Sequence, residues 1–178
     1  MKDCVIGFSG QIGSGKSTLA KATANEFCWP CLSFGHYVRS MAEKRGLNMS
    51  RETLQLLGSE LVESDPRQFC ESALSELQWQ ARQPLIVEGI RHVVILNILK
   101  EICSPLGFYL VFVTVQKNLH TERILNRDQH ITPQYIEQDF TEVQVQTQLK
   151  QHADLIIRND RPKDIVIREM LELFKRMK

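Results

Sequence analysis

Long apolar runs are missing from this chain of 178 residues. No stretch of eighteen uninterrupted apolar residues occurs, so a membrane-spanning helix is not expected. The N-terminus enters a strand-like segment at once, which leaves no room for a signal peptide. These two absences predict a cytoplasmic protein with no membrane partner.

An excess of one charge is also missing, because 22 Lys and Arg residues stand against 21 Asp and Glu residues. Proteins that bind nucleic acid more often show a basic excess or a basic patch. No basic stretch is visible in the sequence either, which disfavours a kinase that acts on nucleic-acid ends. We therefore expect no nucleic-acid partner.

Cysteine is sparse, and its number, five, is odd, which suits a reducing compartment. Cys28 and Cys31 form a C-x-x-C pair, but the pair follows a helical segment and precedes a strand, unlike a thioredoxin-type site. A zinc site needs about four ligands, and no second C-x-x-C occurs. The favoured interpretation is two small cysteines that flank a turn, with a redox or metal role as the alternative.

Apolar runs alternate with helical segments along the chain. The expected strands cover residues 5–9, 31–34, 85–87, 108–115 and 155–157. The expected helices cover residues 17–27, 38–45, 51–64, 66–82, 93–103, 119–128 and 162–178, with another that starts at Pro133. This alternation predicts an α/β, three-layer fold, in which helices cover both faces of a five-stranded parallel sheet.

One domain is expected over residues 1–178. The helical stretch 38–82, between the second and third strands, is longer than a crossover needs and predicts a mobile helical insertion over the ligand site. A short polar stretch over residues 128–134 predicts a lid. The expected oligomeric state is a monomer or a homodimer.

The most specific motif lies at the end of the first strand and fits G-x-x-x-x-G-K-[S/T], the loop that wraps the phosphates of a nucleoside triphosphate. Its glycines let successive N–H groups turn inward as an anion nest, and the next helix points its positive end at the same phosphates. Lys16 is expected to reach the β- and γ-phosphates, and Ser17 to ligate Mg²⁺, so ATP and Mg²⁺ are the expected cofactors. The nucleotide-binding residues expected here are Gly10, Gln11, Ile12, Gly13, Ser14, Gly15, Lys16, Ser17 and Thr18.

Charged residues follow the second and third strands, at the edge of a parallel sheet where ligands bind. Arg39 is expected to bind an anionic acceptor through its guanidinium group, with a solvated surface arginine as the alternative. His36 lies close to Arg39 in the sequence. Glu88 predicts support for Mg²⁺, with a local helix cap as the alternative. Arg91 is expected to bind a phosphate group. His36, Arg39, Glu88 and Arg91 are therefore the expected acceptor-binding residues.

Two arginines follow the fourth strand four residues apart, on one face of a helix. Arg123 and Arg127 predict a pair that neutralises charge on the transferring phosphates, and their alternative is ion pairing on the helix surface. Asn159 follows the fifth strand and predicts a contact to the nucleotide base. Lys16, Arg91, Arg123 and Arg127 are the expected catalytic residues, and Arg123 is also expected to bind ATP.

Over nearly its whole length, the chain resembles the small P-loop kinases related to adenylate kinase and dephospho-coenzyme A kinase. Residues 33–39 are similar to the acceptor stretch Gly-Asp-x-x-Arg, with His36 in place of the aspartate, and residues 88–91 to Asp-Gly-x-(Pro)-Arg, with Glu88 in that place and no proline. Arg123 and Arg127 match the Arg-x-x-x-Arg of the lid helix, and residues 153–159 resemble the close of dephospho-coenzyme A kinases.

This resemblance implies an ATP-dependent kinase that transfers the γ-phosphoryl group to a small nucleotide or nucleotide-like acceptor, in particular a (deoxy)nucleoside monophosphate. It also implies that the three-layer fold is of the P-loop NTPase type and that Arg39 grips the acceptor phosphate. A dephospho-coenzyme A kinase-like activity and a nucleotide-dependent regulatory ATPase stay open as alternatives.

Overall fold

The structure is a computed structural model that describes residues 4–127 and 147–176. Its strands are β1 (Cys4–Ser9), β2 (Cys31–Ser33), β3 (Leu85–Glu88), β4 (Gly107–Thr114) and β5 (Leu155–Arg158). They form one five-stranded sheet in the order β2-β3-β1-β4-β5, and every neighbouring pair is parallel. The predicted five-stranded parallel sheet is confirmed.

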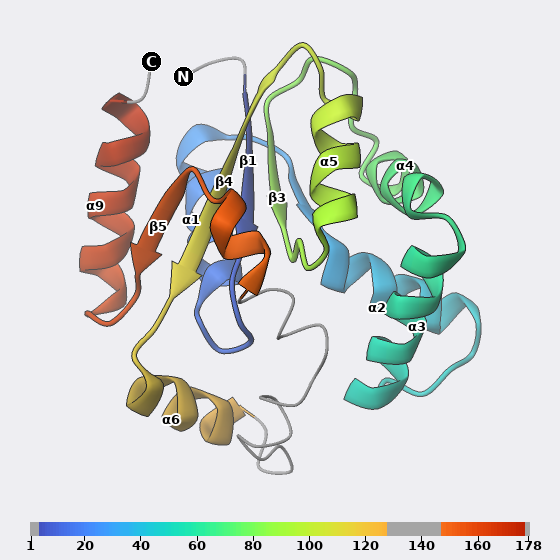
Figure 1. Cartoon of the computed structure of the whole chain (residues 1–178), viewed down its shortest axis with the longest axis horizontal. Helices are drawn as coiled ribbons and strands as arrows, with labels where there is room; N and C mark the ends of the chain where they lie inside the picture. Colours follow the sequence, from blue (N-terminus) through green and yellow to red (C-terminus); the bar gives the residue numbers. More distant parts are fainter. Residues whose placement is uncertain (1–3, 128–146, 177–178) are drawn as a thin grey trace.

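Side chains alternate between the two faces of the sheet, as the pleat of a strand requires. On β1, Val5 belongs to one hydrophobic core and Ile6 to the other, and both are fully buried. Because both faces carry a helix layer, the central strands are largely apolar up to their last residues, which is typical of a parallel sheet. The predicted helix layers on both faces are confirmed (Figure 1).

Helices α1 (Lys16–Phe27) and α9 (Lys163–Arg176) cover one face, and α5 (Val93–Ile102) covers the other (Figure 1). Three helices come between β2 and β3 in the chain: α2 (Phe34–Lys44), α3 (Arg51–Ser64) and α4 (Pro66–Glu76). Of these, α4 packs beside α5 (Figure 1). Helix α6 (Lys117–Arg127) lies beyond the carboxyl ends of the strands, and a short 3₁₀ helix, η1 (Leu149–His152), precedes β5.

Side-chain caps set the starts of the three helices between β2 and β3. The hydroxyl of Ser50 accepts from Thr53 N (3.2 Å) before α3, and the carboxylate of Asp65 accepts from Gln68 N (2.9 Å) before α4. Ser33 accepts from His36 N (3.2 Å), so α2 begins at Phe34, four residues earlier than the sequence predicts. A cap directly after a strand leaves no room for the expected loop.

Helix α4 ends at Glu76, where the sequence predicts helix to residue 82. Gln78 and Arg82 adopt left-handed φ angles of 57° and 71°, which a right-handed helix cannot contain. The indole Nε1 of Trp79 donates to Gln83 O (3.0 Å) and so closes the turn that returns the chain to β3.

The expected lid over residues 128–134 and the helix expected from Pro133 lie outside the described residues. In the described parts of the chain, no helix combines the length and the apolarity that crossing a membrane requires.

Candidate active site

The phosphate-binding loop connects β1 to α1 and has glycines where other residues do not fit. Gly10 and Gly15 have φ angles of 141° and 90°. A Cβ on Gly10 would stand 2.4 Å from the carbonyl oxygen of Val113, and one on Gly15 would stand 2.2 Å from Asn159 Nδ2. Side chains at either position would therefore clash with their surroundings as well as strain the backbone.

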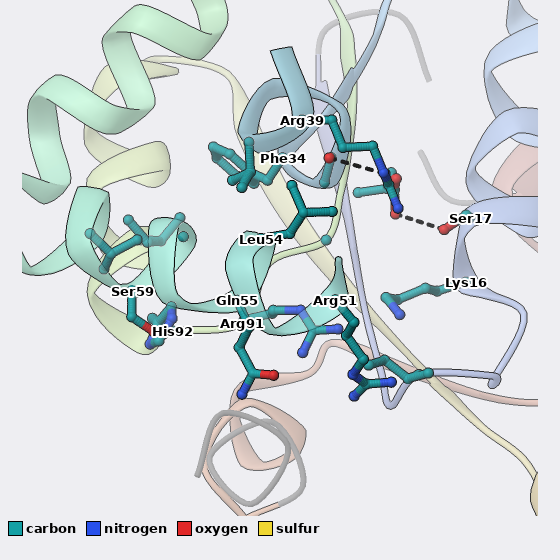
Figure 2. A pocket seen from close by; sticks show the side chains of 18 of the residues that line it. Lys16, Ser17, Phe34, Arg39, Arg51, Leu54, Gln55, Ser59, Arg91 and His92 are labelled. Atoms are coloured by element: carbon teal, nitrogen blue, oxygen red, sulfur yellow. Dashed lines mark hydrogen bonds between the residues drawn. The ribbon is translucent and has the colours of Figure 1, made fainter. Parts of the chain in front are cut away.

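Lys16 and Ser17 open helix α1 from this loop. Lys16 is 9% exposed, and its Nζ donates to the carbonyl oxygen of Gln11 at 3.2 Å. The Ser17 hydroxyl donates to Glu88 Oε2 at 2.9 Å. Both side chains line one cavity, at the positive end of the α1 dipole (Figure 2).

Glu88 ends β3 beside the loop because β3 and β1 are adjacent and parallel, with Phe8 opposite Glu88. The carboxylate is 8% exposed, and its second oxygen, Oε1, accepts from the hydroxyl of Ser33 at the end of β2. It does not cap α5, whose N-cap is His92. Of the two interpretations of Glu88, the geometry favours a carboxylate directed at the phosphate-binding loop.

The described residues fit a magnesium-bound nucleotide. A hydroxyl and a carboxylate in contact at the loop are oxygen donors of the kind that Mg²⁺ takes alongside phosphate oxygens. Two buried polar atoms at the loop, Ser14 Oγ and Arg123 Nη1, have no hydrogen-bond partner among the described residues. The Arg123 atom lies 3.9 Å from where a Cβ on Gly15 would stand, so a buried cation is available next to the loop.

The cavity in front of the loop has a volume of about 440 Å³ and is enclosed by α2, α3, the end of β3 and the start of α5. Arg39 and Arg91 line it, as the sequence predicts for acceptor-binding residues, and Arg39 Nη1 donates to Gly35 O (3.1 Å). Figure 2 shows the side chains of Arg51 and Arg91 reaching into the space that Lys16 also faces.

His36 is not brought to this cavity. It is exposed on α2 and is not among the residues that line the cavity. The pKa of Glu76 is lowered chiefly by the hydrogen bond from Lys44, and to a smaller degree by His36. His36 therefore lies near α4, whereas Arg39, one turn later on α2, lines the cavity.

Two further expected residues lie close to the loop, and one is not described at the side-chain level. Asn159 is 7% exposed, and its Nδ2 donates to Ser14 O (2.8 Å), so it holds the loop backbone. Arg123 lies beside Gly15. Arg127 ends α6, and its side chain lies outside what the structure describes.

Sequence reasoning missed the residues that α3 and the start of α5 add to the cavity. Arg51, Gln55 and Ser59 all line it, and His92 lies beside Ser59, away from Lys16 (Figure 2). The first three are spaced four residues apart, so they share one face of α3. That spacing is the one signal in the sequence that points to them, and it also describes any solvated helix face.

The cysteines are free thiols, and none of those described is held in a metal-ligating cluster. Burial raises the pKa of Cys31 to about 11, with Glu88 as a second cause, and burial raises those of Cys70 and Cys103 to about 12 and about 11. Cys28 is exposed. These surroundings suit the turn-flanking interpretation of Cys28 and Cys31.

Alkylation is therefore expected to modify Cys28 first. The thiolate is the reactive form, and a raised pKa leaves Cys31 almost wholly protonated at about pH 8. Treatment of the folded protein with iodoacetamide, followed by peptide mass spectrometry over time, measures the order of modification. Equally fast labelling of Cys28 and Cys31 would contradict this assignment, and labelling after unfolding provides the control.

Comparison with known proteins agrees with this geometry. Two similar solved structures are a putative kinase from Chloroflexus aurantiacus j-10-fl (19% identity, TM-score 0.66, 100% of each chain) and a gluconokinase from Sinorhizobium meliloti 1021 (19%, 0.58, 98% of this chain and 93% of that one). A third is the APS kinase CysC of Mycobacterium tuberculosis with AMPPNP and APS (18%, 0.59, 98% of each chain). At these identities the likeness establishes a shared α/β fold.

No curated protein matches the sequence significantly. A family model described as an AAA domain matches residues 6–139, which include the phosphate-binding loop, Glu88 and Arg123. The matched stretch spans well over half of the 178 residues. The chain therefore belongs to the AAA domain family.

Proposed function

We propose that this protein is an ATP-dependent phosphotransferase that transfers the γ-phosphoryl group to a small nucleotide or nucleotide-like acceptor, in particular a (deoxy)nucleoside monophosphate. One observation carries the proposal: the loop residues Lys16 and Ser17 share a cavity with Arg39, Arg51 and Arg91. A triphosphate site and a cluster of guanidinium groups in one cavity suit a reaction between two phosphates.

ATP binds with its phosphates in the nest of loop amides between Gly10 and Thr18. Lys16 contacts the β- and γ-phosphates, and Ser17 and Glu88 hold Mg²⁺, which adds positive charge to the phosphate oxygens when bound. The buried Nη1 of Arg123 lies next to Gly15, where it can bind a phosphate oxygen without losing an existing hydrogen bond. Arg127, one turn further on the same helix, supplies a second cation.

The acceptor binds under helices α2, α3 and α4, within the helical insertion 38–82. Its phosphate lies against Arg39, Arg51 and Arg91. Its head group extends towards Gln55, Ser59 and His92, at the end of the cavity away from Lys16 (Figure 2). Phe34 and Phe69 also line the cavity and stack with centroids 4.9 Å apart and 16° between planes, which gives the head group a flat apolar wall.

The composition of the cavity favours a phosphate acceptor over a hydroxyl acceptor. A hydroxyl group needs a base close to the transferred phosphoryl group, whereas an ionised phosphate needs none. Among the described lining residues the only carboxylate is that of Glu88, which contacts Ser17 at the loop and is assigned here to Mg²⁺. His92, the one lining histidine among them, lies at the end of the cavity away from Lys16 (Figure 2). This argument disfavours the dephospho-coenzyme A kinase-like alternative.

In the reaction, an oxygen of the acceptor phosphate attacks the γ-phosphorus in line, and the bond from the γ-phosphorus to its bridging oxygen breaks to release ADP. Lys16, Arg91, Arg123 and Arg127 neutralise the charge that spreads over the transferring group. Positioning of the two phosphates supplies the remaining acceleration. Exclusion of water from the cavity suppresses ATP hydrolysis.

An assay of ADP formation across nucleoside monophosphates, nucleosides and dephospho-coenzyme A tests the proposal. We expect ADP formation to rise steeply with one or a few monophosphates and to stay low with nucleosides. Stimulation by dephospho-coenzyme A alone would favour the hydroxyl-acceptor alternative. A rate of ADP formation that is the same with and without every acceptor would favour a regulatory ATPase.

Arg39→Ala is expected to raise the KM for the acceptor by about 10- to 100-fold, the usual contribution of a hydrogen bond to a charged group. The KM for ATP should change little, because the proposal assigns Arg39 to the phosphate of the acceptor and not to the triphosphate. Arg51→Ala should behave in the same way, although the sequence alone does not predict that Arg51 lines the cavity. Steady-state kinetics with each substrate varied in turn measure both effects.

Arg45→Ala is a matched control for these variants, because Arg45 is exposed after α2 and pairs with Glu60 outside the cavity. An equal rise in both KM values for Arg39→Ala would remove its assignment to the acceptor. A rise that Arg45→Ala reproduces would point to an effect of net charge alone.

A further inference from the structure

One face of α6 packs against the phosphate-binding loop. His120 Nε2 lies 2.6 Å from the carbonyl oxygen of Ile12, across 108 residues of sequence. Ile124 Cγ1 lies 3.2 Å from where a Cβ on Gly13 would stand, and Arg123 lies beside Gly15. Positions 120, 123 and 124 are three and four residues apart, so a single helix face makes all three contacts.

The contact of His120 has a defined polarity. A carbonyl oxygen only accepts, so Nε2 carries the proton and donates to Ile12. A peptide unit is planar and trans, so the C=O of one residue and the N–H of the next point in opposite directions. When His120 holds the carbonyl of Ile12 outward, the N–H of Gly13 must point to the other side, into the nest.

Asn159 makes an equivalent contact two residues further along the loop. Its Nδ2 donates to Ser14 O at 2.8 Å, so the N–H of Gly15 is also directed away from the donor. The two donors come from α6 and from the end of β5, and neither needs to touch the nucleotide. Together they hold alternate carbonyl groups of the loop outward.

We propose that His120 is a positioning residue that, with Asn159, presets the loop amides of Gly13 and Gly15 for phosphate binding. The proposal rests on the proposed function, because the ligand of these amides is the triphosphate. Without His120 the peptide unit between Ile12 and Gly13 can rotate. Binding of ATP must then fix this peptide unit in one orientation, which lowers the affinity of the protein for ATP. The helix that carries Arg123 also loses its polar contact with the loop.

Calorimetric titration of magnesium AMPPNP into the folded, acceptor-free protein tests this directly. His120→Ala is expected to weaken binding roughly fivefold, the effect of one ordinary hydrogen bond. His120→Gln, whose side-chain amide donates from a similar position, should restore most of the affinity. His152→Ala is the control, since His152 is exposed on η1. Thermal unfolding without nucleotide should be similar for all variants.

The outcomes separate the two proposals. If the wild-type protein does not bind magnesium AMPPNP, the proposed function fails and this inference fails with it. If the wild type binds and His120→Ala binds equally well, only the role of His120 is overturned. Equal weakening in His120→Ala and His120→Gln would attribute the effect to ring packing and would also overturn the proposed hydrogen-bond role.

Discussion

Lys16→Ala is expected to lower phosphoryl transfer by about 10³-fold, an effect comparable to removing a group that stabilises charge in a transition state. The ammonium group lies at the mouth of the loop, in the cavity that receives both phosphates. Alanine suits the first turn of a helix, so α1 should still form. We therefore expect an inactive but folded protein, measured by ADP formation and by thermal unfolding.

Lys21→Ala is the matched control for this variant, because Lys21 is exposed on the same helix and does not line the cavity. It should retain wild-type turnover. Near wild-type turnover in Lys16→Ala would remove the proposed mechanism. A large fall in the unfolding temperature of Lys16→Ala would instead assign the loss of activity to the fold.

Glu88→Gln is expected to lower turnover by about 10²- to 10³-fold and to raise the magnesium concentration required for activity. The substitution keeps the shape of the side chain and removes its charge, so the sheet should be preserved. The carboxylate ends β3 and accepts from Ser17, the expected metal ligand of the loop. Titration of activity with Mg²⁺ at fixed ATP measures the shift.

Glu63→Gln, on the exposed surface of α3, controls for the loss of one negative charge. An unchanged magnesium requirement in Glu88→Gln would contradict the metal-supporting role. Reduced stability with normal magnesium dependence would identify Glu88 as a structural link between Ser17 and Ser33.

The sequence is sufficient to predict the sheet and the residues that end its strands. Five short apolar runs separated by helical segments allow a parallel sheet, and a parallel sheet gathers its strand ends at one edge. That rule was enough to place Glu88, Arg39 and Arg91 near Lys16. The contact between Glu88 and Ser17 also depends on β3 being the immediate neighbour of β1, and the sequence does not specify this strand order.

The side of the cavity formed by α3 could not be predicted in the same way. Arg51, Gln55 and Ser59 lie on a helix whose orientation depends on tertiary packing between α2, α4 and α5. Their spacing is shared by solvated helices, so local periodicity cannot distinguish the two cases. The same limit applies to His120 and Asn159, whose partners in the loop are more than 100 residues away in the chain.

The direction of the His36 side chain depends on where α2 begins. The sequence predicts a loop over residues 35–37, in which a side chain can turn towards the ligand. Because Ser33 caps α2 directly after β2, His36 lies in the first helical turn and its direction is fixed by the helix. A capping serine that is also the last residue of a strand leaves little trace in hydrophobic periodicity.

Transfer of label from ATP that carries radioactive phosphorus on its γ-phosphoryl group tests the central claim most directly. The protein is incubated with labelled ATP, Mg²⁺ and the acceptor that gives the fastest ADP formation, and the products are separated. The account predicts that the label appears in the acceptor, as a new phosphoanhydride, in an amount equal to the ADP formed. Label found only in inorganic phosphate would contradict it.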